Sequence, residues 1–212
     1  MKEKESIDKD VENIQLETTE CMEKMAGIKP CKEKYFKLSM FGHIKSRILW
    51  LIILMLSAMV AGVIITHYEE VFEAAPLLIA FIPMLMATGG NSGSQTSTLI
   101  IRGLSVKDIK NSDIWKVFRK ELMISIIIGL MLAILNGIWV VIIYKDFLVA
   151  VAVGLTLIGT IAISKLLGCL LPILAKKFKI DPAVMAAPLI MTIIDVVAMF
   201  LYVMIAIMIL GL

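Results

Sequence analysis

Charged residues are scarce in this sequence, and so are cysteines and catalytic motifs. Only 18% of its 212 residues are charged and the formal net charge is +3, whereas an ordinary soluble domain is about 25% charged. This composition excludes a disordered chain, a collagen-like chain and a nucleic-acid-binding protein. The three cysteines are odd in number and lack the spacing of a disulfide framework or a zinc site: Cys21, Cys31 and Cys169. There is no phosphate-binding loop, dinucleotide-binding fingerprint, HExxH motif or nucleophile elbow, so we expect a protein that is not an enzyme.

Long apolar runs take the place of these features. Hydrophobic residues make up 59% of the chain, and its mean hydropathy is +0.92. Five segments are long enough to cross a hydrocarbon core of about 30 Å: residues 48–65, 74–101, 122–144, 147–174 and 188–212. Because a backbone in lipid must satisfy its own hydrogen bonds, we expect each to be a helix. The sequence predicts an all-α integral membrane protein, with a polar cytoplasmic segment over residues 1–46 and a transmembrane domain over residues 47–212.

Lysine and arginine fall almost entirely on one side of the predicted spans. Segments 32–47, 102–120 and 176–179 hold fourteen of them, whereas the opposite side has Lys145 alone, near the acidic residues of segment 69–73. The positive-inside rule places the basic side in the cytoplasm. We therefore expect a multi-pass protein of the cytoplasmic membrane, with its N-terminus in the cytoplasm and its C-terminus outside.

Asp195 is a carboxylate in the middle of the last apolar run. Such a group costs roughly 2.5–3.5 kcal/mol on insertion scales, so it must face water, a cation or a partner. One interpretation is an ion path, and the alternative is an interhelical ion pair with Lys165, the only basic residue well inside a span. Counting residues from the cytoplasmic ends of the two helices puts Asp195 at the level of Gln95 and Ser94.

The second apolar run contains a polar stretch from Thr88 to Thr98. Three glycines lie within five residues of one another: Gly89, Gly90 and Gly93. Four polar side chains share one face at helical spacing: Asn91, Ser94, Gln95 and Thr98. The glycines permit a break that would present carbonyl groups to a pore, or close packing against a neighbouring helix. The stretch therefore predicts the polar lining of an ion path or a small-residue packing face.

Together these side chains offer oxygen ligands only, which suits a hard cation. Mg²⁺ holds its water shell tightly and is commonly bound through one or two carboxylates plus water. One aspartate per chain fits a hydrated ion, and a two-fold dimer would bring two such carboxylates together. The chemistry alone is equally compatible with Mg²⁺, Na⁺, H⁺ or Mn²⁺.

Two blocks of the sequence resemble the MgtE-type magnesium transporters. Residues 81–104 read FIPMLMATGGNSGSQTSTLIIRGL and are similar to the second transmembrane helix of that family. Residues 181–196, which begin with Asp181-Pro182-Ala183 and contain Asp195, are similar to its fifth helix. The resemblance covers about residues 45–212. It implies a homodimer with five helices per subunit, whose ion path is lined by the second and fifth helices of both subunits.

The same resemblance implies a function and site residues. We expect uptake of Mg²⁺, or another divalent cation, across the cytoplasmic membrane down its electrochemical gradient, with Asp195 as the pore carboxylate. Four further residues would line the path: Gly90, Asn91, Ser94 and Thr98. Asp181 would belong to a magnesium-sensing site at the cytosolic mouth, although the residues alone favour a helix N-cap there. Residues 1–46 leave no room for the acidic N-terminal domain and paired CBS domains common in the family, so we expect the chain to lack them.

Two other functions stay open on sequence grounds. An H⁺- or Na⁺-coupled secondary carrier would use Asp195 as its coupling site. A non-transporting membrane assembly protein would use an Asp195–Lys165 pair as an interhelical lock. The expected partners are a second copy of the chain, the lipid bilayer and divalent cations, with no nucleic acid.

Overall fold

The described part of the chain is helical almost throughout. The computed structural model describes residues 2–30, 35–110, 113–185 and 187–212, and no strand occurs among them. Cys31, Lys32 and Lys34 lie outside these ranges. The elements in chain order are α1 (Lys2–Met25), α2 (Met40–His67), α3 (Glu69–Ala74), the 3₁₀ helix η1 (Pro76–Phe81), α4 (Ile82–Ser105), α5 (Ile114–Tyr144), α6 (Phe147–Lys177), the 3₁₀ helix η3 (Pro182–Met185) and α7 (Ala187–Leu210).

Five helical segments are long and apolar enough to span a membrane. They are α2, η1 together with α4, α5, α6 and α7 from Pro188 onward. The prediction of an all-α integral membrane protein with five spanning helices is therefore confirmed. Two helices begin well before their predicted starts, because α2 begins at Met40 and not at residue 48, and α5 begins at Ile114 and not at residue 122.

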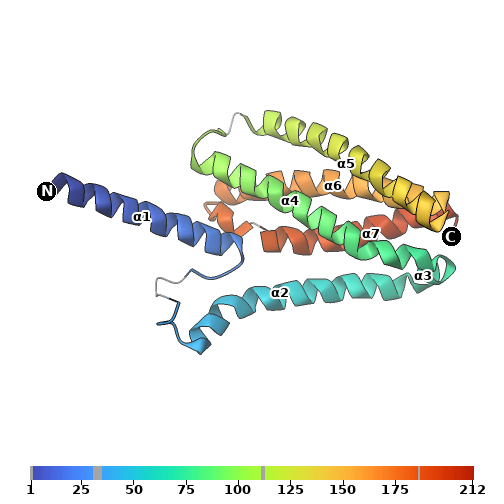
Figure 1. Ribbon diagram of the computed structural model, residues 1–212, viewed down its shortest axis with the longest axis horizontal. Helices are drawn as coiled ribbons and strands as arrows, with labels where there is room; N and C mark the ends of the chain where they lie inside the picture. Colours follow the sequence, from blue (N-terminus) through green and yellow to red (C-terminus); the bar gives the residue numbers. More distant parts are fainter. Residues whose placement is uncertain (1, 31–34, 111–112, 186) are drawn as a thin grey trace.

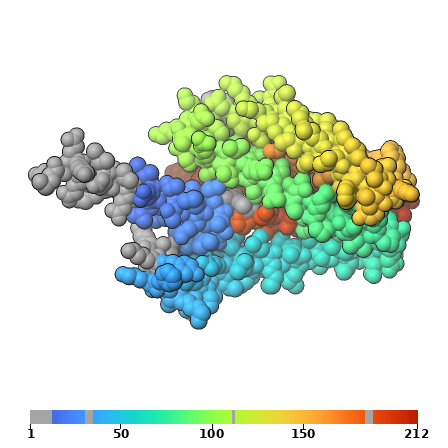
Figure 2. Space-filling model, in the orientation of Figure 1, coloured from blue at the N-terminus to red at the C-terminus, as the bar shows by residue number. Residues whose placement is uncertain are grey.

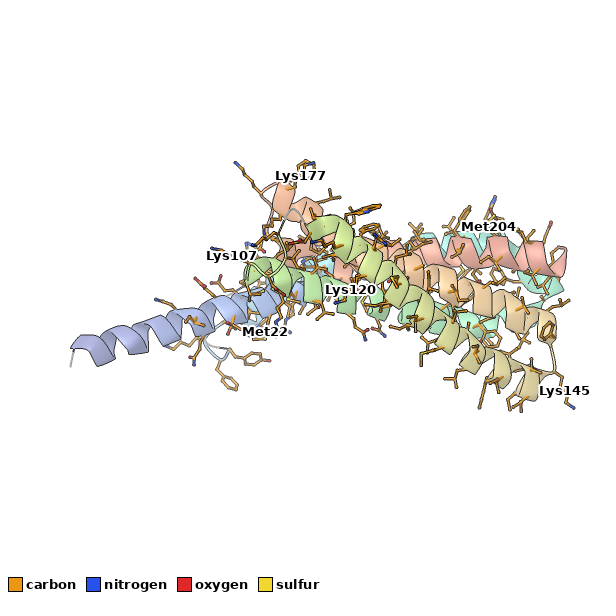
Figure 3. All side chains as sticks on the ribbon, turned by 90° about the horizontal axis from the view of Figure 1, so that it is seen from above. Met22, Lys107, Lys120, Lys145, Lys177 and Met204 are labelled. Carbon is orange, nitrogen blue, oxygen red and sulfur yellow. The ribbon has the colours of Figure 1, made fainter. Side chains whose placement is uncertain are left out.

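The spanning helices form one bundle in which α4, α6 and α7 are central. The helix α5 packs along α6, and α2 packs along α7 (Figure 1). The helix α1 projects from the end of the bundle where α4 connects to α5, and the C-terminus lies at the opposite end. Lys107 and Lys177 lie at the end that carries α1, and Lys145 lies at the other end (Figure 3). The basic segments thus gather at one end of the bundle, which is the distribution that the predicted orientation requires.

Apolar side chains cover the outside of the bundle as well as its interior. The outer helices α2 and α5 expose large side chains such as Met55 and Leu135, which are 55% and 67% exposed. Apolar surfaces of this kind can contact lipid acyl chains directly and need no other protein to bury them. Inside, the Tyr202 hydroxyl of α7 donates a hydrogen bond to the Leu78 carbonyl at 2.9 Å, which attaches η1 to the core.

The glycines of α4 pack against neighbouring helices and do not break the helix. α4 is continuous over its whole length, so the predicted opening of the backbone toward a pore is absent from this segment. Instead, a Cβ atom added to Gly168 of α6 would collide with the Gly93 carbonyl oxygen. Ser164 of α6 also donates a hydrogen bond to the Gly89 carbonyl. The structure therefore supports the small-residue packing interpretation of this stretch.

Gly168→Ala should destabilise the bundle, because the added methyl group meets the backbone of α4 and fits only if a helix moves. Overpacking of this kind costs about 1–3 kcal/mol. Gly137→Ala in α5 is the matched control, since no atom lies within 4 Å of the Cβ added there. Thermal unfolding of the detergent-solubilised protein measures both changes. Equal stability of the two variants would contradict the close approach of α4 and α6.

Candidate functional site

One face of α4 carries polar side chains that nothing in the described part of the subunit covers. Asn91, Gln95 and Thr98 are exposed and lie on one side of the helix, as their spacing predicts. Ser94 is half-buried beside them, and its Oγ has no hydrogen-bond partner among the described residues. Figure 2 shows part of α7 (red) at the surface between α4 (green) and α2 (cyan). We call this side of α4 the polar face.

Asp195 is a half-buried carboxylate on α7. No hydrogen bond or ion pair joins it to any residue that the structure describes. Its neighbours on α7 pack against the glycines of α4: a Cβ placed on Gly89 would lie 2.7 Å from Ile194 Cγ2, and one placed on Gly90 would lie 3.0 Å from Met191 Cγ. Because Met191 lies one turn before Asp195 on the same side of α7, these contacts put the carboxylate beside α4 near Gly89.

The depth of Asp195 differs from the sequence prediction, which put it level with Gln95 and Ser94. A Cβ placed on Gly93 would lie 2.6 Å from Ile190 Cγ2, so the two helices pair Gly93 with Ile190 and Gly89 with Ile194. Gln95 therefore lies about 9 Å from the level of Gly89 along the helix axis. The count was wrong because α4 continues well past the level at which α7 begins.

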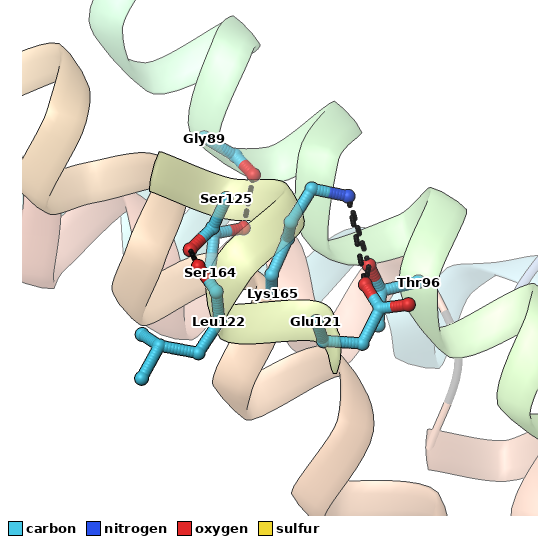
Figure 4. Close-up of polar contacts among 7 residues, drawn as sticks. All are labelled: Gly89, Thr96, Glu121, Leu122, Ser125, Ser164 and Lys165. Carbon is cyan, nitrogen blue, oxygen red and sulfur yellow. Dashed lines mark hydrogen bonds and ion pairs between the residues drawn. The ribbon is translucent and has the colours of Figure 1, made fainter. Parts of the chain in front are cut away.

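Lys165 does not pair with Asp195, so the predicted alternative of an Asp195–Lys165 lock is wrong. Its Nζ lies 3.8 Å from Glu121 Oε2 and donates a hydrogen bond to Thr96 Oγ1 at 3.2 Å (Figure 4). Thr96 in turn donates to Glu121 Oε2 at 3.0 Å. The lysine thus neutralises a different carboxylate, inside the bundle, and leaves Asp195 without an ionic partner in the described chain.

Glu121 is the residue that sequence reasoning missed. It follows Arg119 and Lys120 and lies just outside the predicted span 122–144, yet it is only 9% exposed. The signal that could have found it is the apolar pattern of residues 114–118, which extends the third helix toward its N-terminus and draws Glu121 inside.

Asp181 lies at the end of the bundle that carries α1. Its Oδ1 accepts a hydrogen bond from the Ala183 N–H at 3.0 Å, which is the N-cap contact that the residues alone favour. Its Oδ2 accepts a hydrogen bond from Lys24 Nζ of α1 at 2.7 Å. Partial burial acts to raise the pKa of Asp181, but the hydrogen bonds from Lys24 and Ala183 outweigh it and lower that pKa. The hydrogen bond to Asp181 raises the pKa of Lys24.

A closed cage for a metal ion is absent from the described residues. No three His, Cys, Asp or Glu side chains come together there in a way that could hold one. The polar face of α4 offers amide and hydroxyl oxygens, and Asp195 offers a carboxylate at its border. This donor set suits an ion that keeps much of its water shell.

The fold and the site define a multi-pass helical membrane protein whose spanning helices carry a polar face and a carboxylate that has no partner among the described residues. The MgtE family model, described as a divalent cation transporter, matches residues 82–205, more than half of the chain. The chain belongs to the MgtE family.

Three relatives share this similarity, and each is named magnesium transporter MgtE. The Thermus thermophilus protein is 32% identical over 203 residues, which are 95% of this chain. The Bacillus subtilis and Enterococcus faecalis proteins are 32% and 30% identical, each over 74% of this chain. The matched regions make up 44%, 35% and 34% of those relatives, so the chain spans less than half of their length.

Lys24→Ala should loosen the end of α1 at neutral pH, because it removes the ion pair with Asp181. The Asp181 side chain is 44% exposed, so the contact contributes only about 0.2–1 kcal/mol, which is up to about fivefold in the docking equilibrium. Hydrogen–deuterium exchange of amides 22–28 measures the change. Lys177→Ala, which removes an exposed lysine at the same end, is the control.

The same docking should depend on pH in a defined direction. The lowered pKa of Asp181 gives a stabilisation that is present above its ordinary value of about 3.9 and is lost as the pH falls further. The raised pKa of Lys24 gives one that is present below about 10.4 and is lost as the pH rises through the raised value. After correction for intrinsic rates, we expect exchange of these amides to be slower in the wild type than in Lys24→Ala near neutral pH. This difference should shrink progressively as the pH falls below about 3.9.

Proposed function

We propose that the chain forms a homodimeric path for Mg²⁺ uptake, lined by α4 and α7 of both subunits, with Asp195 as the pore carboxylate. The observation that carries this proposal is a half-buried carboxylate with no ionic partner in the described chain, beside an exposed polar face on a spanning helix. Neither feature is tolerated against acyl chains, because unsatisfied polar groups cost free energy in hydrocarbon.

A second copy of the chain is the cover that best fits the polar face. A two-fold dimer places the same surface on both sides of the contact, so each polar face meets its own counterpart. Water or a hydrated cation between the two faces would then satisfy Asn91, Ser94 and Thr98. Gly90 is buried against Met191, so its role would be to let α7 approach and to bring Asp195 to the border of the path.

Charge favours a divalent ion between two such subunits. Two Asp195 carboxylates balance the charge of one Mg²⁺, and each can accept hydrogen bonds from water that the ion retains. With the basic end of the bundle in the cytoplasm, the membrane potential drives the ion inward, by roughly 4.6 kcal/mol per 100 mV for two charges. Asp181, at that same end, would sense Mg²⁺ at the mouth of the path.

Asp195→Asn should lower Mg²⁺ uptake at least about tenfold, which corresponds to a transport barrier about 1.4 kcal/mol higher. The measurements are growth rescue of a magnesium-uptake-deficient bacterium and Mg²⁺ flux into proteoliposomes. Asp195→Glu keeps the charge and should retain part of the flux. Unchanged flux in Asp195→Asn would contradict the proposal, and flux that moves protons together with an organic substrate would favour a carrier instead.

The dimer contact can be tested separately from transport. In a chain whose native cysteines are replaced by serine, the thiol introduced by Asn91→Cys should form a disulfide between two copies under mild oxidation, because the polar faces meet across the two-fold axis. Met131→Cys on α5 exposes a thiol on an apolar surface and serves as the control. A cross-link at the α5 position alone would place the interface elsewhere.

A further inference from the structure

We propose that the buried cluster of Glu121, Lys165 and Thr96 sets the rotation of α4 about its own axis, and so aims the polar face of α4 into the ion path. These three are positioning residues for transport and not ligands of the ion. The inference rests on the proposed function, because it takes the polar face of α4 as the lining of the path.

The cluster joins three helices inside one subunit. Thr96 comes from α4, Glu121 from α5 and Lys165 from α6, and they are 1%, 9% and 5% exposed. Each member contacts the other two, at 3.0 Å, 3.2 Å and 3.8 Å (Figure 4). A buried pair of charges is strongly held together because separation would leave each one uncompensated in a medium of low polarity.

Thr96 projects from the side of α4 opposite the polar face. It follows Asn91 by five residues, which places it about 140° around the helix from Asn91. Thr96 is buried, whereas Asn91, Gln95 and Thr98 are exposed. Whatever fixes Thr96 therefore fixes the direction in which these three side chains point.

The middle of α4 approaches α6 and α7 through Gly89, Gly90 and Gly93, which have no side chains to interlock with the neighbouring helices. Apolar side chains nearer its two ends, such as Leu85 and Ile100, pack in the interior without directional contacts. The hydrogen bond from Ser164 to the Gly89 carbonyl and the cluster at Thr96 are directional contacts between α4 and its neighbours. The cluster has no net charge, so it can orient α4 without placing a fixed charge near the path.

Thiol labelling can measure this orientation directly. In a cysteine-free chain, Gln95→Cys places a thiol on the polar face, and a membrane-impermeant cationic reagent reports its exposure to water. We expect Glu121→Gln and Lys165→Met each to slow labelling by about 2- to 30-fold, the range given by a coupling of about 0.5–2 kcal/mol. The charge-swapped pair, Glu121→Lys with Lys165→Glu, should restore much of the rate.

Mg²⁺ flux in the same proteins distinguishes an effect on the orientation of α4 from a direct effect of the Glu121 and Lys165 charges on the ion. Positioning predicts that both single variants lower the maximal flux and that the swapped pair recovers it. Lys120→Met, which removes an exposed lysine next to Glu121, is the matched control and should change neither readout. Opposite effects of the two single variants on flux, with unchanged labelling, would show that only a nearby charge matters and would overturn the inference.

The experiments also distinguish orientation of α4 from a role of the cluster in stability alone. Lower melting temperatures in both single variants, with labelling and flux per folded protein unchanged, would overturn the inference. Failure of the Gln95→Cys thiol to label when Glu121 and Lys165 are intact would also overturn it. Asp195→Asn in the same background tests the proposed function on its own, because it should lower flux at least about tenfold and leave labelling unchanged. Retained flux in that variant would count against the pore carboxylate and not against the orientation of α4.

Discussion

The absence of water inside a membrane is the constraint on which the rest of this structure depends. Every polar group among the spanning helices needs a hydrogen-bond or ionic partner within the protein, or a cavity that water can enter. The bundle divides its polar residues accordingly. Glu121, Lys165 and Thr96 satisfy one another in the interior, whereas Asp195 and the polar face of α4 have no such cover in the described chain. Asp195 and the polar face of α4 therefore need contact with water, an ion or another copy of the chain.

Glycine serves packing in α4, and this explains how one helix can carry two different faces. Without side chains at Gly89 and Gly93, α4 lies so close to α6 that the Gly93 carbonyl occupies the space where Gly168 would need a Cβ. A buried seam of this kind holds the helix against the bundle while the opposite face stays polar. The helix therefore does not need to unwind to present oxygen atoms, because its side chains already present them.

The two ends of the bundle differ in charge and in what is attached to them. The end with Lys107 and Lys177 also receives α1, whose Lys24 reaches the Asp181 carboxylate ahead of α7. A cation supplied by the chain thus occupies a carboxylate at the end where the proposed path would open. Because the two groups are partly exposed, their contact is weak and readily exchanged.

The sequence alone determined the all-α class, the five spans, the exposed polar face of α4 and the unusual position of Asp195. These follow from composition and helical spacing, because lipid penalises polar groups residue by residue. Only the tertiary structure decided that α4 is unbroken, that Lys165 pairs with Glu121, and that Asp195 lies near Gly89. Those features depend on where α5 begins and on how α4 and α7 are offset. Such offsets come from packing between residues far apart in the chain, for which local spacing carries no signal.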